Sequence, residues 1–486
     1  MIRSIRRVSF VFGILLLALL VNITYIQVFR ADDYRARSDN QRVIRDEYGR
    51  ERGPILTGPE PIALSEETKG ALRYLRVYPE GPKYAAVTGF YSIVYGATGL
   101  ERTENEVLSG SSDLFFVDRV QQLVAGRQPR GGGVTTTLNA AAQTAAWEGL
   151  SGTQGAVVAI EPSTGRILAS VQSPSFDPNL LSSHKPQQIR EYYDQLIDDP
   201  DQPLLNRPIV ALNPPGSTFK LVTTAAALAS GRFTPESVLP GPAEYDLPLS
   251  SRTIRNWTGE ECGPNGEVTL IDALVISCNT AFAWLGNELG DDALRAQAEA
   301  FGFDTAFEIP LRASTSRFPQ DPDPPQTALS AIGQFDVRAT ALQMAMVAAG
   351  IGNNGVVMEP YLVQEIRAPD LAILRTADPS EFASAMTPQD ASQLQQMMVA
   401  VVERGTAGIL QGITDAAGRP VPVGAKTGTA QTGNDRRPVA WMVAVAPANN
   451  PQVAVAVVVE DGGQDEVSGN ALAGPIARAV IEAVLQ

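Results

Sequence analysis

The pattern of apolar and polar positions sets one long uncharged run apart from the rest of the chain. Residues 8–28 read VSFVFGILLLALLVNITYIQV, which is long enough to cross a bilayer as a helix. Arg3, Arg6 and Arg7 precede it, so the positive-inside rule predicts a cytoplasmic N-terminus and an extracytoplasmic remainder. A cleaved signal peptide is the alternative, but the run ends in TYIQVFRADDY, without a small-x-small cleavage site. We therefore expect an uncleaved, single-pass membrane anchor.

The stretch after this run is polar and then mixed. Residues 31–50 are rich in charge and predict a juxtamembrane stalk, which we expect to be helical. Residues 52–130 contain short apolar runs broken by Gly and Pro, which indicates a small irregular or β-containing domain without a catalytic signature. The Arg-Gly-Gly-Gly sequence at 130–133 is typical of a linker.

The remainder of the chain contains β-rich segments at both ends and helix-rich segments between them, which predicts an α+β domain. Asn139 is a good N-cap for a helix, and two β-rich runs around Pro-Ser-Thr-Gly predict a hairpin at 155–172. Two further strands are expected within 439–461, before a closing helix at 471–486. Between these ends the chain is helix-rich, with a polar loop at 230–265. We predict an antiparallel sheet built from both ends, covered by the first and last helices, with the helical insert on its other face.

The length of 486 residues suits two or three domains. The expected division is a cytoplasmic tail at 1–7, a transmembrane anchor at 8–29, an N-terminal non-catalytic domain at 30–134 and a catalytic domain at 135–486.

The composition of the chain limits the partners and the kinds of site that it can have. The formal net charge is −15, which makes nucleic acid a poor partner. There is one histidine, His184, so zinc sites built on several histidines are excluded and a histidine-dependent triad would have to use that residue. The two cysteines, Cys262 and Cys278, do not form a C-x-x-C pair, and their even number permits one disulfide outside the cytoplasm. Spacing alone leaves two unpaired thiols as an equal alternative.

The first candidate chemical motif is Ser217-Thr-Phe-Lys220, which follows Pro-Pro-Gly at the start of an apolar helical run. A spacing of three places both side chains on one helix face. A buried lysine of lowered pKa can accept the proton of a serine nucleophile, and a helix N-terminus stabilises an oxyanion. Taken alone, the pattern also fits an ordinary helix with a solvated lysine.

Two further motifs follow in order. Ser277-Cys-Asn279 interrupts an apolar helical stretch, where a hydroxyl and an amide need partners. Lys426-Thr427-Gly428-Thr429 opens a strand, where a cation and two hydroxyls suit a carboxylate and glycine permits close approach of a ligand backbone. Taken separately, the S-x-N motif also fits a helix–helix turn, and the K-T-G motif also fits an edge strand protected by a lysine. Together, S-x-x-K, S-x-N and K-T-G are the signature set of penicillin-recognising serine enzymes.

At this point the chain resembles a class B penicillin-binding protein, a monofunctional peptidoglycan D,D-transpeptidase. The resemblance covers about 135–486, including IGQFDVRATALQMAMVAAGIGNNGVVMEPYLV and MMVAVVERGTAGIL. The anchor, ERGPIL at 51–56, YPEGPKYAAVTGFYS and YGATGLE are most similar to the short actinobacterial branch of the class, which acts in septal wall synthesis. The resemblance implies a penicillin-recognising transpeptidase fold with a role in cell-wall synthesis and cell division.

The resemblance also implies residue roles. Ser217 would attack the penultimate D-Ala of a stem peptide ending in D-Ala-D-Ala, and Lys220 would take the Ser217 proton. Ser277 would relay a proton to the leaving amine, while Asn279 would bind the donor peptide and hold Lys220.

The remaining implied roles concern binding. Lys426 would supply positive potential, and Thr427 and Thr429 would bind the terminal carboxylate. The backbone N–H groups of Ser217 and Thr429 would form the oxyanion hole. β-Lactams would acylate the serine, and no metal or organic cofactor is implied.

Several alternatives are weighed against this interpretation. A class D β-lactamase shares Ser-Thr-Phe-Lys but usually carries valine where Asn279 stands, and it lacks the anchor and the extra domain. A β-lactam sensor would need several membrane spans, and a bifunctional enzyme would need a glycosyltransferase domain for which 30–134 is too short. A divisome scaffold with a vestigial pocket is the non-enzymatic alternative. By family inference we expect contacts with a polytopic glycosyltransferase or other divisome proteins.

Overall fold

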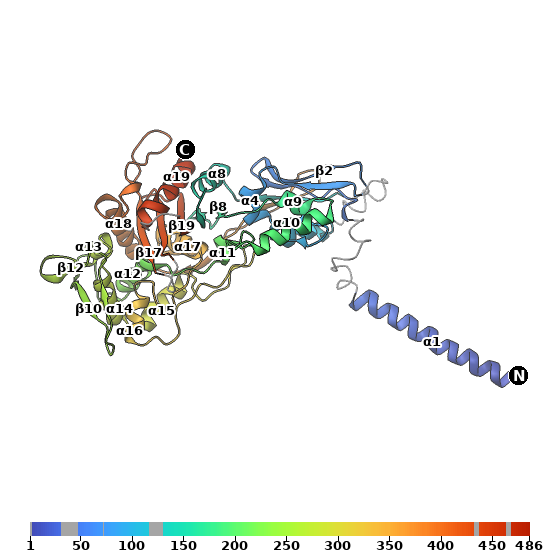
Figure 1. The fold of residues 1–486 in the computed structure, drawn as a ribbon, viewed down its shortest axis with the longest axis horizontal. Coiled ribbons are helices and arrows are strands. Elements are labelled where there is room, and N and C mark those ends of the chain that lie inside the picture. Colours follow the sequence, from blue (N-terminus) through green and yellow to red (C-terminus); the bar gives the residue numbers. More distant parts are fainter. Residues whose placement is uncertain (1, 31–46, 71, 116–129, 432–436, 463–467) are drawn as a thin grey trace.

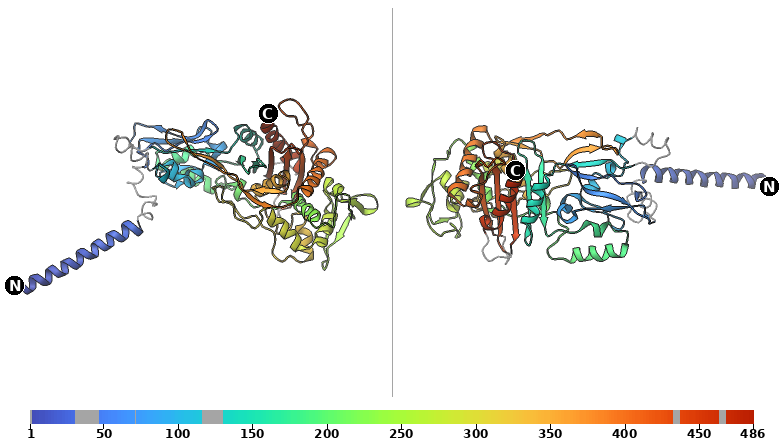
Figure 2. Two further views of the ribbon diagram at one scale, coloured as in Figure 1. Left: turned by 180° about the vertical axis from the view of Figure 1, so that it is seen from behind. Right: turned by 90° about the horizontal axis from the view of Figure 1, so that it is seen from above.

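The computed structural model describes residues 2–30, 47–70, 72–115, 130–431, 437–462 and 468–486. Helix α1 (Ile2–Phe29) lies apart from the folded body (Figures 1 and 2). Among the described residues it is the one helix long and apolar enough to cross a membrane, and none of its apolar stretch is buried. The part of the predicted stalk at 31–46 lies outside the described residues.

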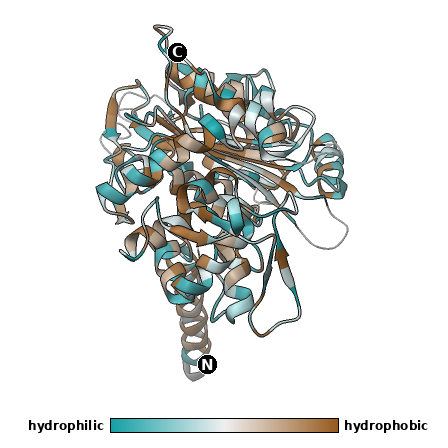
Figure 3. Cartoon of the chain, turned by 90° about the vertical axis from the view of Figure 1, so that its left-hand side faces the viewer, coloured by the Kyte–Doolittle hydropathy of each residue, from teal (hydrophilic) through white to brown (hydrophobic). Residues whose placement is uncertain are grey.

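A five-stranded antiparallel sheet forms the centre of the larger part of the molecule. It is assembled from both ends of the 135–486 region, as predicted, because the hairpin at 154–173 pairs with the last strand of the chain. The order is β17 (Gly424–Ala430), β18 (Val439–Ala446), β19 (Val453–Asp461), β7 (Gln154–Ile160) and β8 (Ile167–Ser173). The three inner strands β18, β19 and β7 are buried on both faces and consist mainly of apolar residues, which are brown in the middle of Figure 3.

Helices cover both faces of this sheet. α8 (Ala140–Gly149) and α19 (Gly474–Leu485) pack against each other and against the sheet, and α17 (Ala341–Gly352) packs against the other face (Figure 1). The predicted cap of α8 is confirmed, because the Asn139 side chain accepts hydrogen bonds from two backbone N–H groups at 3.0 Å each. Every residue of α17 is buried, as its uninterrupted small and apolar sequence requires.

The helical insert lies beside the sheet on the side of α17. Its helices are α12 (Lys220–Ala229), α13 (Leu270–Val275), α14 (Asn279–Leu289), α15 (Asp291–Ala300), α16 (Pro324–Ser330) and α18 (Pro388–Arg404). The segment predicted as a polar loop at 230–265 is not irregular throughout. It contributes to two antiparallel pairs, β10 (Glu244–Asp246) with β11 (Thr253–Arg255), and β9 (Val238–Pro240) with β12 (Glu267–Thr269). A third pair joins β13 (Val356–Met358) to β16 (Glu381–Ser384).

A second sheet of six strands forms the middle of the elongated molecule (Figure 1). Four strands come from the N-terminal region, but two come from far along the chain, which no local pattern revealed. The order is β15 (Ile373–Thr376), β14 (Val363–Arg367), β6 (Gly133–Thr136), β1 (Ile55–Thr57), β2 (Glu60–Glu67) and β3 (Tyr74–Val77), with β1 and β6 parallel.

Short elements complete this part. They are α4 (Gly81–Thr88), β4 (Tyr91–Ser92), β5 (Gly96–Ala97), α5 (Gly99–Thr103), α6 (Asn105–Leu108), α9 (Pro178–Ser182) and α10 (Pro186–Asp198). The short helix α11 (Arg207–Val210) instead packs against α17, β7 and β8 of the larger part. α9 packs against β3 and α4 although it follows β8 in the chain. Segments from beyond residue 135 thus lie in the N-terminal part, and the division of the chain at 134 stays a prediction.

The predicted linker at 130–133 is wrong. Its glycines are buried, and Gly131 and Gly132 donate backbone hydrogen bonds to Glu51 O and Val107 O at 2.9 Å each. A Cβ atom on Gly131 would lie 1.9 Å from the Leu108 carbonyl oxygen. The glycines are there because backbone segments meet without room for a side chain, which in sequence is indistinguishable from flexibility.

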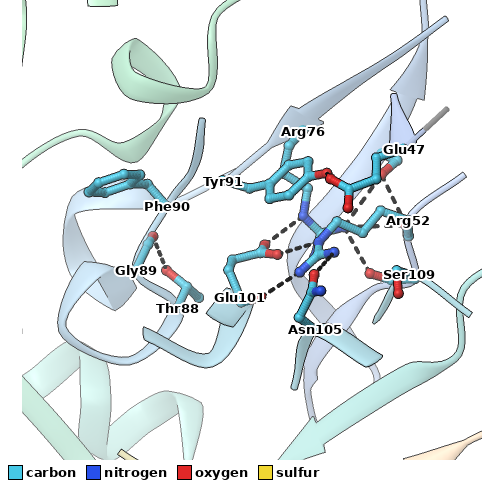
Figure 4. A network of polar contacts seen from close by, with 12 residues as sticks. Glu47, Arg52, Arg76, Thr88, Gly89, Phe90, Tyr91, Glu101, Asn105 and Ser109 are labelled. Carbon is cyan, nitrogen blue, oxygen red and sulfur yellow. Dashed lines mark hydrogen bonds and ion pairs between the residues drawn. The ribbon is translucent and has the colours of Figure 1, made fainter. Parts of the chain in front are cut away.

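A buried ion network holds the N-terminal part together (Figure 4). Glu101 is fully buried, and its carboxylate accepts from Arg52 Nε and Arg76 Nε at 2.6 Å each and from the Tyr78 hydroxyl at 3.2 Å. Burial opposes ionisation of Glu101, but the guanidinium groups of Arg76 and Arg52 outweigh it and hold the pKa of this carboxyl below its ordinary value. Two cations and one anion thus share a buried site.

Candidate active site

The S-x-x-K motif spans a tight turn and the start of a helix. Ser217 lies half-buried in the 3₁₀ turn Gly216–Phe219, and Lys220 is the fully buried first residue of α12. Gly216 has φ +53°, and a Cβ atom there would lie 2.9 Å from the Thr429 carbonyl oxygen. Trp441 Nε1 donates to Pro214 O at 3.0 Å from the next strand of the sheet. The turn is therefore fixed against β17 and β18.

The Lys220 amine reaches the second motif. Nζ donates to Ser277 O at 2.8 Å, to Ser277 Oγ at 3.2 Å and to Asn279 Oδ1 at 2.9 Å. Burial lowers the pKa of Lys220 well below its ordinary value, and the charge of Lys426 lowers it further. A neutral amine needs only two acceptors, so deprotonation leaves a lone pair that can take a proton.

Ser277 links the second motif to the third. Its hydroxyl also accepts from Lys426 Nζ at 2.9 Å, and Lys426 donates in addition to Thr427 O at 3.0 Å. Burial lowers the pKa of Lys426 to about 7. Ser277 has φ +61°, a conformation that a non-glycine residue adopts at a cost, and this aims its side chain between the two lysines. With both lone pairs occupied, the Ser277 O–H remains available to a third group.

The K-T-G motif lies on β17, an edge strand of the five-stranded sheet. Thr429 is half-buried, whereas Thr427 is nearly buried and its hydroxyl lies 2.6 Å from that of Thr406. The nearest atoms to a Cβ on Gly428 would be Pro215 O and Thr218 Cγ2, both at 3.0 Å. In this structure the glycine therefore permits close contact between the strand and the nucleophile turn.

The two cysteines are joined. A Cys262–Cys278 disulfide links the middle residue of the S-x-N turn to the segment before β12, which decides the alternative that spacing left open. Cys278 is the N-cap of α14, and its sulfur accepts from Ala281 N at 3.4 Å.

Sequence reasoning missed two residues that contact the motifs. Asn256 follows β11 and accepts hydrogen bonds from the backbone N–H groups of Asn279 and Thr280, at 3.0 and 3.1 Å. Thr406 follows α18 and pairs with Thr427. Both belong to turn-rich segments far from the motifs in sequence, so no local pattern distinguished them.

Histidine chemistry is absent from this site. His184 lies beside β3 in the N-terminal part, where Nε2 contacts Tyr74 O at 3.1 Å, and burial lowers its pKa. Within the described ranges no cluster of His, Cys, Asp or Glu could hold a metal ion. Serine, two buried lysines and an amide remain, and the three predicted motifs meet at one place. Fold and site together define a penicillin-recognising serine acyltransferase.

Comparison with known proteins gives the family. Residues 155–482 match the penicillin binding protein transpeptidase domain, and residues 52–134 match the penicillin binding protein A dimerisation domain. The chain belongs to the penicillin-binding protein transpeptidase family. It is 47% identical to the peptidoglycan D,D-transpeptidase PbpA of Mycolicibacterium smegmatis and 46% identical to that of Mycobacterium tuberculosis, over 99% of each chain in both cases.

Solved structures of penicillin-binding proteins are also similar to this chain. Penicillin-binding protein A from M. tuberculosis, as its ceftriaxone acyl-enzyme complex, superimposes with a TM-score of 0.87 and 45% identity, covering 91% of this chain and all of the other. Its imipenem acyl-enzyme complex gives a TM-score of 0.86 with the same identity and coverage.

Proposed function

We propose that this chain is a PbpA-type peptidoglycan D,D-transpeptidase in which Ser217 forms the acyl-enzyme. The observation that supports this best is the single hydroxyl, Ser277 Oγ, held between two buried lysines at 3.2 and 2.9 Å, with one of them three residues from Ser217. This arrangement offers a base, a nucleophile and a proton relay without histidine or metal.

Acylation begins when neutral Lys220 takes the Ser217 proton and Ser217 Oγ attacks the carbonyl carbon of the penultimate D-Ala. The negative charge on the carbonyl oxygen is held by the N–H groups of Ser217 and Thr429. The C–N bond to the terminal D-Ala breaks, and the leaving nitrogen takes a proton from Ser277, which recovers one from Lys220. An amine of a second stem peptide then attacks the ester, forms the cross-link and releases Ser217.

Binding and orientation fall to the remaining motif residues. Lys426 contributes positive potential, and the hydroxyls of Thr427 and Thr429 bind the substrate carboxylate. Asn279 binds the donor peptide and holds Lys220, with its Oδ1 2.9 Å from Nζ. β-Lactams acylate Ser217 because they present an amide and a carboxylate in the same arrangement.

Intact-mass spectrometry of the full chain in detergent, with penicillin G, tests this proposal. One adduct that persists for many minutes on the wild type and is absent from Ser217→Ala would support it. An adduct that clears within seconds would indicate a β-lactamase. A folded wild-type protein without an adduct would contradict catalysis and favour a scaffold.

We further propose that α1 is an uncleaved single-pass anchor with a cytoplasmic N-terminus and an extracytoplasmic catalytic domain, and that the enzyme acts in cell division. The anchor and the 31–130 region would contact a polytopic glycosyltransferase. Exchange of α1 for a foreign transmembrane helix should weaken recovery of that partner in a pull-down. Unchanged recovery would show that the anchor makes no specific contact.

A further inference from the structure

Helix α14 begins at the catalytic turn with an unusual cap. The backbone N–H groups in the first turn of any helix lack partners within the helix. Ser, Thr, Asp and Asn are the residues that usually satisfy them from the N-cap position. Here the N-cap is Cys278, whose sulfur is bonded to Cys262 and accepts from the backbone N–H of Ala281 and from the Thr280 hydroxyl. The N–H groups of Asn279 and Thr280 must find acceptors elsewhere.

Asn256 supplies that acceptor from another segment. Its Oδ1 accepts from Asn279 N at 3.0 Å and from Thr280 N at 3.1 Å. Its Nδ2 donates to Pro242 O at 2.9 Å and to Glu260 O at 3.0 Å. The side chain is 8% exposed, and all four hydrogen-bonding positions of the amide are used. Turning the amide over would oppose donor to donor and acceptor to acceptor, so this orientation is unambiguous.

The same segment also holds the side chain of Asn279. Asn279 Nδ2 donates to the carbonyl oxygen of Arg255 at 3.1 Å, next to Asn256 in sequence. Backbone and side chain of Asn279 are thus held by consecutive residues. Because Nδ2 is directed to Arg255, Oδ1 faces Lys220 Nζ at 2.9 Å.

We infer that Asn256 is a positioning residue for acylation, which acts through Asn279 to place an acceptor on Lys220. The inference rests on the proposed function and extends it to a residue outside the three motifs. Asn256 replaces a conventional N-cap, which allows a cysteine in the middle of the S-x-N turn without loss of order at the start of α14.

The test measures the second-order rate of acylation by penicillin G for the full chain and for Asn256→Ala. A displaced Asn279 should slow acylation on the order of 100-fold, the effect of a misplacement of about 1 Å in a catalytic group. Asn179→Ala is the matched control, because Asn179 similarly bridges Tyr78 N and Tyr78 O, at 2.9 Å each, in the N-terminal part. It should acylate at the wild-type rate.

Two further readouts separate positioning from a merely structural role. Asn256→Asp keeps the oxygen that accepts from both N–H groups, so it should acylate at least tenfold faster than Asn256→Ala. Its second carboxylate oxygen would face the carbonyl oxygens of Pro242 and Glu260, so this variant should be no more stable than Asn256→Ala. In Asn256→Ala the Lys220 ammonium also loses an acceptor, so the acid limb of the acylation rate should move to lower pH. The charged group facing Lys220 is Lys426, and in the described structure neither lysine has a carboxylate within 4 Å.

The outcomes are distinct. An Asn256→Ala variant that acylates within about threefold of wild type, or is slowed no more than Asn179→Ala, overturns the inference while leaving the proposed function intact. A wild-type protein that penicillin G does not acylate overturns both. If Asn256→Ala does not fold, as judged by circular dichroism, Asn256→Ser takes its place, because its shorter side chain cannot reach both N–H groups. A wild-type rate with an unshifted acid limb in Asn256→Ser overturns the inference.

Discussion

The buried ion network around Glu101 allows a quantitative prediction. Glu101→Gln removes one negative charge from a site where two guanidinium groups, those of Arg52 and Arg76, lie 2.6 Å from the carboxylate and are themselves buried. The amide also turns N–H donors toward one of those guanidinium groups. Breaking a buried pair by removing one partner costs about 3–5 kcal/mol, because an unpaired charge stays buried. We expect the N-terminal part to lose this much stability.

The assay must resolve one part of the molecule from the other, since a single unfolding midpoint is not defined for such a chain. All four tryptophans lie within 135–486, so their fluorescence follows the catalytic region alone. Hydrogen–deuterium exchange of peptides within 74–108 follows the network. In Glu101→Gln these peptides should exchange about 150- to 5,000-fold faster, as a loss of about 3–5 kcal/mol in opening free energy requires. Acylation by penicillin G in the cold should be unchanged.

Glu67→Gln is the control. Glu67 pairs with Arg73 at 3.0 Å on the same sheet, but both side chains are exposed, at 63% and 50%, so the variant should exchange like wild type. The wild type should show the corresponding pH dependence. Because the folded pKa of Glu101 is lowered, its contribution is complete above the unfolded carboxyl pKa and is lost as pH falls through the folded value. An increase in exchange of tenfold or less in Glu101→Gln would mean that water already reaches the guanidinium groups, and would refute the reasoning.

Three further predictions concern the catalytic site. Lys426→Met removes a charge near Lys220 and should therefore raise the pKa of Lys220. The acid limb of the pH profile of the acylation rate should then move to higher pH. An acid limb that stays in place or moves to lower pH would contradict the coupling between the two lysines. Gly333→Ala should abolish acylation in a folded protein, because its Cβ would lie 2.1 Å from the Gly216 oxygen. Gly290→Ala, with a similar positive φ and open space, should acylate normally in the same mass assay. Cys262→Ser should lower stability to urea by about 3 kcal/mol and slow acylation; an unchanged rate would limit the disulfide to stability.

Much of the catalytic region could be predicted from the sequence because its signals are local. The hairpin at 154–173, the closing strands and α8 follow from periodicity and turn chemistry over a few residues. The three motifs were found because each lies within four residues of chain. Their meeting point in space was inferred from their order and from resemblance, and the structure supplies the contacts through Ser277.

The elements that sequence reasoning missed depend on pairing across long separations. β14 and β15 join a sheet whose other strands lie more than 200 residues earlier, and neither strand is strongly apolar. The Arg-Gly-Gly-Gly segment was misassigned because glycine serves both loose linkers and the tightest backbone contacts. Asn256 escaped because an asparagine in a turn-rich segment ordinarily bonds its own neighbours.

Several residues of the catalytic site adopt conformations or positions that their side chains ordinarily disfavour. Ser277 is a non-glycine residue at φ +61°, Cys278 occupies a cap position that suits it poorly, and Lys220 and Lys426 are buried without a carboxylate in the described structure. Each of these features lowers the stability of the fold. Such features are expected together at a site where residues are selected for chemistry and not for folding. The motifs also come from different layers, since Ser277 belongs to the helical insert and Lys426 to the edge of the sheet. The Lys426–Ser277 hydrogen bond at 2.9 Å therefore joins the two layers across the site. Any separation of insert and sheet would break this hydrogen bond and expose Lys426 to water. It would also raise the pKa of Lys220, because both burial and the charge of Lys426 lower that pKa.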